Sequence, residues 1–149
     1  MSKKENRQIL MGLLAKSPFE VIDNLWTTLN LTPNYELFRA PEIGLVQLQG
    51  KMGGTGNRFY VGDATITRAV VLIENKYYGY SYIMGRDKKK AQLCALIDGL
   101  MQINEYQITI EEKLLLPLLK LLETQKNEKN KATEATRVDF FTLVRGEDE

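Results

Sequence analysis

The chain has 149 residues, with 20 lysines and arginines, 19 aspartates and glutamates, and no histidine. This near-neutral balance creates no field that points to nucleic acid or to a membrane surface as a partner. The absence of histidine excludes Ser-His-Asp and Cys-His nucleophile systems and every histidine-ligated metal site. A single cysteine, Cys94, excludes an internal disulfide and thiolate metal centres, and it fits a reducing compartment.

These bounds predict one cytoplasmic domain over residues 1–149, with no metal and no cofactor. The polar start predicts no signal peptide, and no apolar run approaches the roughly 18 residues of a membrane span. Any chemistry would have to use carboxylates, lysine, arginine, tyrosine or another subunit.

Residues 1–34 are predicted to form a two-helix arm. The first helix runs from Lys3 to Ala15 with an aliphatic stripe along one face. Ser17 can cap the second helix, Pro18 suits its first position, and Glu20 completes a capping box. The arm can pack on its own sheet or on a partner.

Residues 35–102 have the pattern of an antiparallel sheet followed by a helix. Short strands are predicted from Tyr35 to Ala40 and from Leu45 to Lys51, on either side of a turn. The strongest strand pattern runs from Ala64 to Ile73, and Tyr77 to Met84 forms its return strand. The tyrosines of the return strand share one face, which is typical of a half-buried sheet and also of an interface hot spot.

Between the strands lies a glycine-rich stretch from Met52 to Asp63. Five glycines fall within thirteen residues: Gly50, Gly53, Gly54, Gly56 and Gly62. The stretch lacks the lysine of a P-loop, and its spacing does not match a dinucleotide fingerprint. It is either a long hairpin loop or a contact loop for an anion or a partner.

Several arginines are candidates for binding. Arg68 lies among aliphatic residues and must be paired, either inside the chain with an aspartate or glutamate, such as Asp63 or Asp139, or with another subunit or a phosphate. Arg86 precedes a helix from Lys88 to Gln102. Asp87 is its predicted N-cap, and the lysines of its first turn form either an anion site or a solvated cluster.

If the strands from Ala64 to Ile73 and from Tyr77 to Met84 form a hairpin, Gly85 lies near Asp63. We therefore expect Arg58, Arg68 and Arg86 to gather at one edge of the sheet, close to the glycine loop.

Residues 103–136 are predicted to be helical. A capping box is predicted at Thr109–Glu112, and Leu114 to Leu122 holds seven leucines, which predicts a helix buried on all sides or facing a partner. Pro117 is expected to kink or restart this helix, and 125–136 to be a solvated extension or a linker. Residues 137–149 hold a last strand, from Arg137 to Val144, and an acidic tail.

The predicted fold is α+β: an antiparallel sheet of four to five strands with helices on one face, the N-terminal two-helix arm and a leucine-rich C-terminal helix.

Several motifs, in this order along the chain, resemble the PhnG family, a small subunit of the bacterial carbon–phosphorus lyase system. They are Gly44-Leu-Val-Gln-Leu-Gln49, Met52-Gly-Gly-Thr-Gly56, Arg58-Phe59, Gly62-Asp-Ala-Thr65, Thr67-Arg68-Ala69, Gly79-Tyr-Ser81, Gly85-Arg-Asp-Lys88, Cys94-Ala-Leu-Ile-Asp98 and Arg137-Val-Asp-Phe-Phe-Thr142. The resemblance runs from about Tyr35 to Gln102 and again from Arg137 to Gly146.

The resemblance implies an accessory or structural subunit in organic phosphonate catabolism. The complex would transfer an alkylphosphonate to C1′ of the ribose of ATP and release adenine, which yields ribose 1-methylphosphonate 5-triphosphate. Other subunits of the lyase, foremost the I subunit, are the implied partners, and ATP and alkylphosphonate are ligands of the complex. The resemblance carries no catalytic residue over to this chain.

Candidate residues for a substrate, phosphate or partner contact are Gly53, Gly54, Gly56, Arg58, Asp63, Arg68, Arg86 and Lys88. The alternative is a stand-alone nucleotide-binding module, or a phosphoryl or glycosyl transfer enzyme that uses Asp63 or Asp139 as general base. The leucine-rich segment and the two-helix arm also predict that the isolated chain associates with itself.

Overall fold

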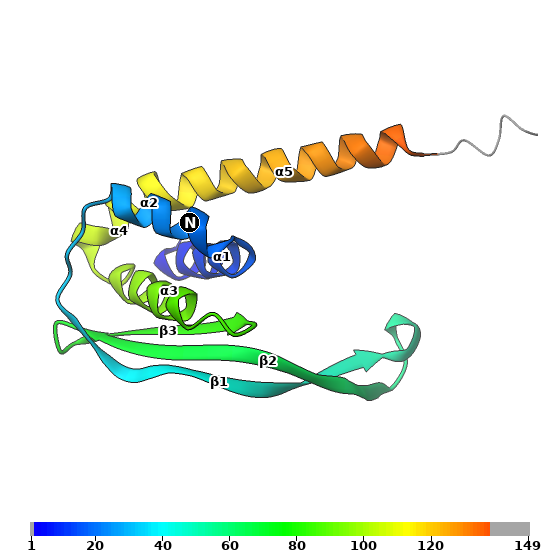
Figure 1. The fold of residues 1–149 in the computed structure, drawn as a ribbon, viewed down its shortest axis with the longest axis horizontal. Helices are drawn as coiled ribbons and strands as arrows, with labels where there is room; N and C mark the ends of the chain where they lie inside the picture. Colours follow the sequence, from blue (N-terminus) through cyan, green and yellow to red (C-terminus); the bar gives the residue numbers. More distant parts are fainter. Residues whose placement is uncertain (1, 138–149) are drawn as a thin grey trace, which may run out of the picture.

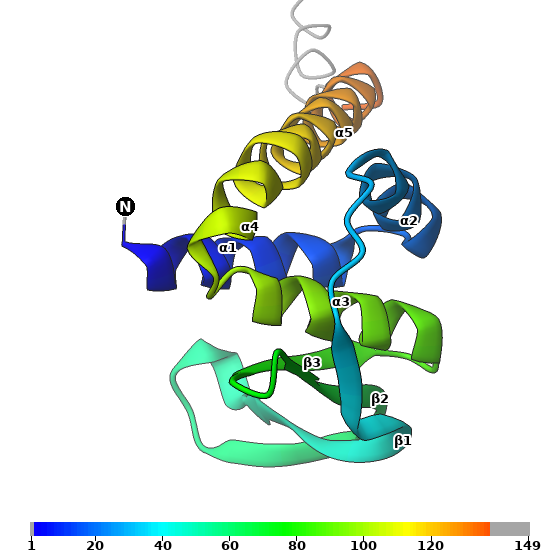
Figure 2. The same cartoon turned by 90° about the vertical axis from the view of Figure 1, so that its left-hand side faces the viewer.

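The computed structural model describes residues 2–137 and forms a layered α+β fold. Its sheet has three antiparallel strands in the order β1 (Tyr35–Lys51), β2 (Arg58–Ile73), β3 (Tyr77–Met84). Helix α3 (Lys88–Leu100) lies directly on the sheet, and α1 (Lys3–Lys16) lies beyond it (Figures 1 and 2). We call the face under α3 the inner face. The opposite, outer face is covered by no described helix (Figure 1).

The expected count of four to five strands is wrong for the described residues. The two short strands predicted around residues 41–44 are one continuous strand, β1, with register shifts between Leu37 and Arg39 and between Arg39 and Glu42. Pro41 is tolerated because β1 is an edge strand, where a missing N–H costs no ladder bond. The predicted last strand begins at Arg137, and the rest of it lies outside the described residues.

The two N-terminal helices are present, but their junction differs from the prediction. Ser2 and Glu5 form a capping box on α1, whereas Ser17 ends α1 and its hydroxyl donates to the Leu13 carbonyl oxygen at 2.8 Å. The N-cap of α2 (Phe19–Thr28) is Pro18, and no side chain caps this helix. Ser17 lies between the two helices, and because its hydroxyl is bonded at the C-terminal end of α1, it does not cap α2.

The C-terminal segment is helical from Asn104 to Ala135, close to the predicted range 103–136, but the capping box predicted inside it is absent. Helix α4 (Asn104–Ile110) passes through a π-helical turn, η2 (Glu111–Leu115), into α5 (Leu116–Ala135), so no capping box forms at Thr109–Glu112. Pro117 lies in the first turn of α5, directly after the π-helical turn η2. The helix is therefore interrupted just before Pro117, as expected from the proline. Residues 125–135 extend α5 in solvent.

The leucines are divided between the core and the surface. Leu114, Leu115 and Leu118 are buried, whereas Leu116 is 50% and Leu121 is 44% exposed. The N-terminal helices pack on the same core: Leu10, Leu14 and Ile22 are fully buried with these leucines. Both segments that were expected to drive self-association therefore cover the protein's own core first.

Two glycines allow α3 to lie against β3. A Cβ on Gly79 would overlap the Ala95 carbonyl oxygen and lie 2.6 Å from the Gly99 nitrogen. A Cβ on Gly99 would lie 2.6 Å from Cδ1 of Ile73. Because the first two obstacles are backbone atoms, they cannot rotate away, and the helix and strand backbones meet directly at these residues.

This approach brings the buried Asp98 to the edge of β3. Its carboxylate accepts the Arg7 guanidinium at 2.5 and 2.8 Å and the Tyr80 backbone N–H at 2.9 Å. The hydrogen bond that Arg7 donates to Asp98 raises the pKa of Arg7. One carboxylate thus joins α1, α3 and β3.

We expect Gly79→Ala to lower the free energy of unfolding by about 2–3 kcal/mol, because the methyl group overlaps backbone atoms of α3. Gly12→Ala is the matched control: it lies in α1 with no atom within 4 Å of the added Cβ. That change should stabilise the protein by about 0.5–1 kcal/mol. Urea unfolding followed by circular dichroism measures both, and an unchanged Gly79→Ala would contradict the close contact.

We expect Arg7→Met to cost about 2–4 kcal/mol of folding stability, because it leaves a buried carboxylate with one donor. The double variant Arg7→Met, Asp98→Asn should lose less than the sum of the two single variants. Urea unfolding of the wild type, the two single variants and the double variant measures this double-mutant cycle. Additive losses would show that the two side chains do not act as a pair.

Candidate functional site

A two-stranded β-ribbon projects beyond the helices. The strand β3 ends at Met84, opposite Ile66, while β1 and β2 remain paired as far as Lys51 and Arg58. We call residues 44–51 and 58–65 the β-ribbon; in Figure 1 it extends away from the helical layers with none packed on it. It is the most exposed regular structure of the sheet.

The glycine-rich stretch forms the tip of the β-ribbon. Gly53 (φ 58°) and Gly54 (φ 78°) lie in the left-handed region that favours glycine, within the short helix η1 (Met52–Gly54). Gly56 donates its N–H to the Met52 carbonyl oxygen at 2.7 Å, and a Cβ there would lie 2.5 Å from that oxygen. The hairpin-loop interpretation is therefore confirmed for the loop's structure.

The structure separates the basic residues that were expected to cluster. The Gly85 N–H donates to the Thr65 carbonyl oxygen at 2.9 Å, so Arg86 does follow a residue close to Asp63. Arg58, however, is paired with Lys51 at the tip. Seven residues of strand separate Thr65 from Arg58, about 23 Å at the usual rise. The glycine loop and Arg58 thus lie far from Arg86.

Arg68 makes an internal ion pair with a glutamate, which confirms the internal alternative, but the partner is neither Asp63 nor another of the residues named for it. Its Nε lies 2.6 Å from Oε1 of Glu42, and Nη1 of Arg39 lies 3.5 Å from the same oxygen. Glu42 stands directly opposite Arg68 in the ladder, but residues 41–44 were read as a turn. Asp63, the expected partner, instead accepts the Tyr60 hydroxyl at 2.8 Å, which raises the pKa of Tyr60.

The lysines at the start of α3 have different roles. Asp87 caps the helix as predicted, accepting the Lys90 backbone N–H at 2.9 Å. The Lys90 ammonium donates to the Ala15 carbonyl oxygen at 3.0 Å, at the carbonyl end of α1. This contact explains a cation in a turn where the helix dipole disfavours it. Lys88 and Arg86 are exposed.

The tyrosine stripe lies on the outer face, the one without helices. Tyr78, Tyr80 and Tyr82 are 39%, 48% and 65% exposed. Phe38, 63% exposed, packs its ring edge-on against Tyr78 with 5.2 Å between centroids. Aromatic residues that are half exposed and already ordered by one another are typical of interface hot spots.

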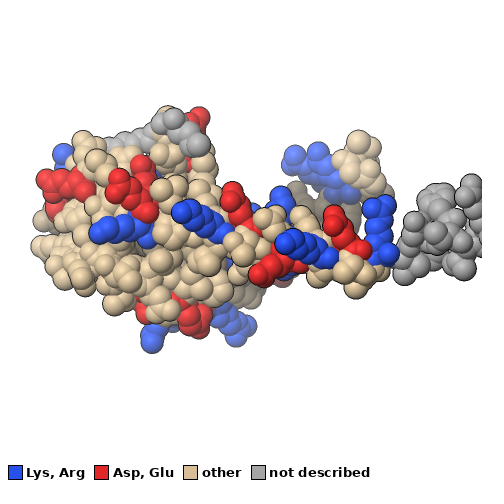
Figure 3. Space-filling model, turned by 90° about the horizontal axis from the view of Figure 1, so that it is seen from above, with Lys and Arg blue, Asp and Glu red and all other residues tan. Residues whose placement is uncertain are grey.

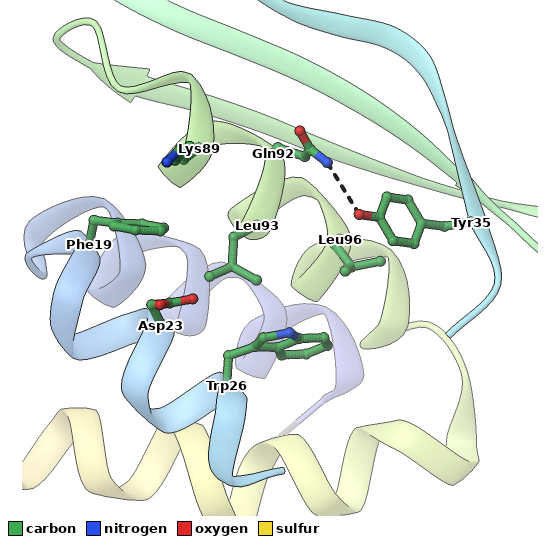
Figure 4. Close-up of a pocket in the computed structure, with 8 residues that line it drawn as sticks. All are labelled: Phe19, Asp23, Trp26, Tyr35, Lys89, Gln92, Leu93 and Leu96. Atoms are coloured by element: carbon green, nitrogen blue, oxygen red, sulfur yellow. Dashed lines mark hydrogen bonds between the residues drawn. The ribbon is translucent and has the colours of Figure 1, made fainter. Parts of the chain in front are cut away.

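A hollow of about 430 Å³ lies between α1, η2 and the start of α5. A smaller one, open to solvent, has mixed apolar and polar walls. It measures about 270 Å³ and lies between α2, α3 and the start of β1. Figure 4 shows the rings of Phe19, Trp26 and Tyr35 around Leu93, and Gln92 donates to the Tyr35 hydroxyl at 3.2 Å. It falls just below the roughly 300–1,000 Å³ of small-molecule sites.

The described residues hold no recognisable catalytic set. Burial raises the pKa of Cys94 to about 12, so its thiol is not a nucleophile at neutral pH. No three acidic or sulfur side chains in residues 2–137 are placed to hold a metal ion. In the view from the α5 side, acidic and basic residues alternate along the helix without a patch of one sign (Figure 3). No described helix has both the length and the apolar character that crossing a bilayer requires.

The chain is similar to known proteins along almost its whole length. A protein of Rhizobium meliloti (strain 1021), the α-D-ribose 1-methylphosphonate 5-triphosphate synthase subunit PhnG, is 38% identical over 138 residues, which cover 93% of this chain and 88% of the relative. Residues 5–146 match the family described as phosphonate metabolism protein PhnG. The match includes the glycine tip, the Arg68 strand and the Asp98 helix described above. The chain therefore belongs to the PhnG family of phosphonate metabolism proteins.

Proposed function

We propose that this chain is a subunit of α-D-ribose 1-methylphosphonate 5-triphosphate synthase and that it supports the reaction without catalysing it. The observation that carries the proposal is the similarity to the Rhizobium meliloti subunit over 93% of the chain. The absence of a nucleophile, base or metal set among the described residues supports a structural role.

The complex would join an alkylphosphonate to C1′ of the ribose of ATP and release adenine, in the cytoplasm. This chain would contribute surfaces that hold other subunits of the lyase, foremost the I subunit. The exposed tip of the β-ribbon and the exposed Leu116 and Leu121 of α5 support this, since monomeric proteins rarely expose extended apolar surfaces. The uncovered outer face supports self-association of the pure chain.

The candidate contact residues fall into two groups in this proposal. Gly53, Gly54, Gly56 and Arg58 form the exposed tip, which suits contact with a neighbouring subunit. Arg86 and Lys88 follow the end of β3, where Gly85 is bonded to Thr65, two residues from Asp63. The N–H groups at the start of α3 that Asp87 does not accept would help these two residues to hold a phosphate. Arg68, already paired with Glu42, would contribute to the outer face.

The alternative is a self-sufficient transfer enzyme with Asp63 or Asp139 as general base. Asp63 lies on the open β-ribbon and is hydrogen-bonded to Tyr60, without a cleft that excludes water. Asp139 lies outside the described residues. The assay below separates this alternative from the proposal.

We expect the pure chain to show no adenine release from ATP and methylphosphonate, and the chain combined with the other synthase subunits to show it. Chromatographic detection of adenine is the measurement. Asp63→Asn should leave the activity of the complex unchanged. Turnover by the chain alone that Asp63→Asn abolishes would overturn the subunit proposal in favour of the alternative.

We expect Arg86→Ala to reduce ATP or phosphonate use by the assembled complex about 10-fold or more, because an arginine–phosphate hydrogen bond is charge-assisted. The complex should remain intact in size-exclusion chromatography. Lys76→Ala, in the turn at the opposite end of β3, is the matched control. Loss of assembly in Arg86→Ala would show that this residue holds a partner and not a substrate.

A further inference from the structure

The outer face of the sheet continues without interruption onto the β-ribbon. Paired residues of antiparallel strands share a face, so Arg68, opposite Glu42 and Tyr82, fixes which residues point outward. Alternate residues of a strand point to the same face, so Val46 and Leu48, four and six residues after Glu42, also point outward. Gly50 leaves room there for Phe59 and Val61, whose side chains would lie 3.0–3.3 Å from a Cβ at that position.

The two faces of the β-ribbon differ in a way that no helix explains. The outward residues Val46, Leu48, Phe59 and Val61 are apolar. The inward side, which would continue the face under α3, carries mainly polar residues: Gln47, Gln49, Lys51, Arg58 and Tyr60, with Leu45 as the apolar exception. The apolar pattern therefore continues on the side where the described chain provides no cover.

A two-stranded ribbon of this length needs support. Isolated two-stranded hairpins are marginally stable in water. Leu48, Phe59 and Val61 are nevertheless 40%, 45% and 60% exposed. Burial of this face would stabilise the β-ribbon, and a cover of matching length is needed.

We propose that the outer face, including the β-ribbon, is the interface between two copies of this chain. Ile66 is the ninth of the sixteen residues of β2, close to its midpoint. A two-fold axis there would lay the β-ribbon of each copy on the sheet of the other. The face is then self-complementary, as an isologous interface requires.

The rows of side chains match about this axis. With the axis running across the strands and the two sheets crossed at about 30°, Leu48 and Val61 of one copy would lie over Val70 and Tyr80 of the second copy, and Phe59 would lie near Tyr78. The Arg68–Glu42 pair faces Ala64 of the second copy, so like charges do not meet. The two sheets pack face to face, with the usual small angle between their strands.

The available area is sufficient for a specific dimer. Three strands over the eight residues of β3, plus two strands over a similar length of β-ribbon, give about 600 Å² per copy from the usual rise and strand spacing. Two copies then bury about 1,200 Å², at the lower limit of specific interfaces. This places the proposed self-association on one surface, and it does not depend on the synthase reaction.

Two leucines of the same strand provide the test. Leu48 points outward and Leu45 inward, and they are 40% and 68% exposed, so neither change should unfold the monomer. In sedimentation of the pure full-length chain at about 10–100 μM, we expect a dimer. Leu48→Glu should raise its Kd at least about 100-fold by burying unpaired carboxylates, and Leu45→Glu should leave it unchanged. Circular dichroism checks the fold of both variants.

A disulfide tests the orientation. Mixing Leu48→Cys with Tyr80→Cys should give a cross-linked pair under mild oxidation, whereas either variant alone should not. The native Cys94 does not interfere because it is buried and its pKa is raised to about 12.

A monomer at 100 μM, a dimer that survives Leu48→Glu, equal effects of both glutamates, or no mixed cross-link would each overturn the proposal. If the chain is monomeric and another synthase subunit protects the outer face from hydrogen exchange, the face belongs to that subunit. The proposed function would then stand without the dimer.

Discussion

The close approach of α3 to β3 is the contact on which the rest of the fold depends. It requires glycine at positions 79 and 99, because a side chain at either would meet the opposing element. Once the backbones meet, Asp98 reaches the Tyr80 N–H and still accepts Arg7 from α1. A buried carboxylate is tolerated only because all of these donors converge on it. Asp98 thus adds a polar link between α1, α3 and β3 to the apolar core that the helices and the sheet share.

The same helix determines which parts of the sheet stay open. On the inner face, Ile73, Val71 and Ala69 are buried beneath α3, and Ser81 donates to the Ala91 carbonyl oxygen at 2.6 Å. The outer face and the β-ribbon receive no such cover from the described residues. The exposed apolar and aromatic residues expected of an assembly subunit therefore lie on the outer side of the sheet. The buried core that stabilises the fold lies on the inner side.

Local sequence signals predicted the parts of the fold that depend on neighbouring residues. The hairpin of β2 and β3 and the N-terminal helices follow from the period of apolar residues, and the cap at Asp87 follows from capping preference, whereas the cap expected from Ser17 is absent. Sequence could not show that β1 continues through Pro41, because an edge strand tolerates proline and the ladder is a tertiary property. It follows that Glu42 was missed as the partner of Arg68, although an internal pair was among the alternatives. The separation of Arg58 from Arg86 depends on how far β1 and β2 extend beyond β3, which no local pattern reports.

Two side chains, one from α3 and one just after it, also occupy part of the free edge of β3. Asp98 accepts the Tyr80 N–H, and the Gln102 side chain donates to the Tyr78 carbonyl oxygen at 2.5 Å. A further strand added at Tyr78 and Tyr80 would have to displace both bonds. Among the described residues, open edges remain along β1 and along the β2 strand of the β-ribbon, on opposite sides of the sheet. The contact that attaches α3 to the sheet thus also protects this part of β3 from edge-to-edge pairing with another chain.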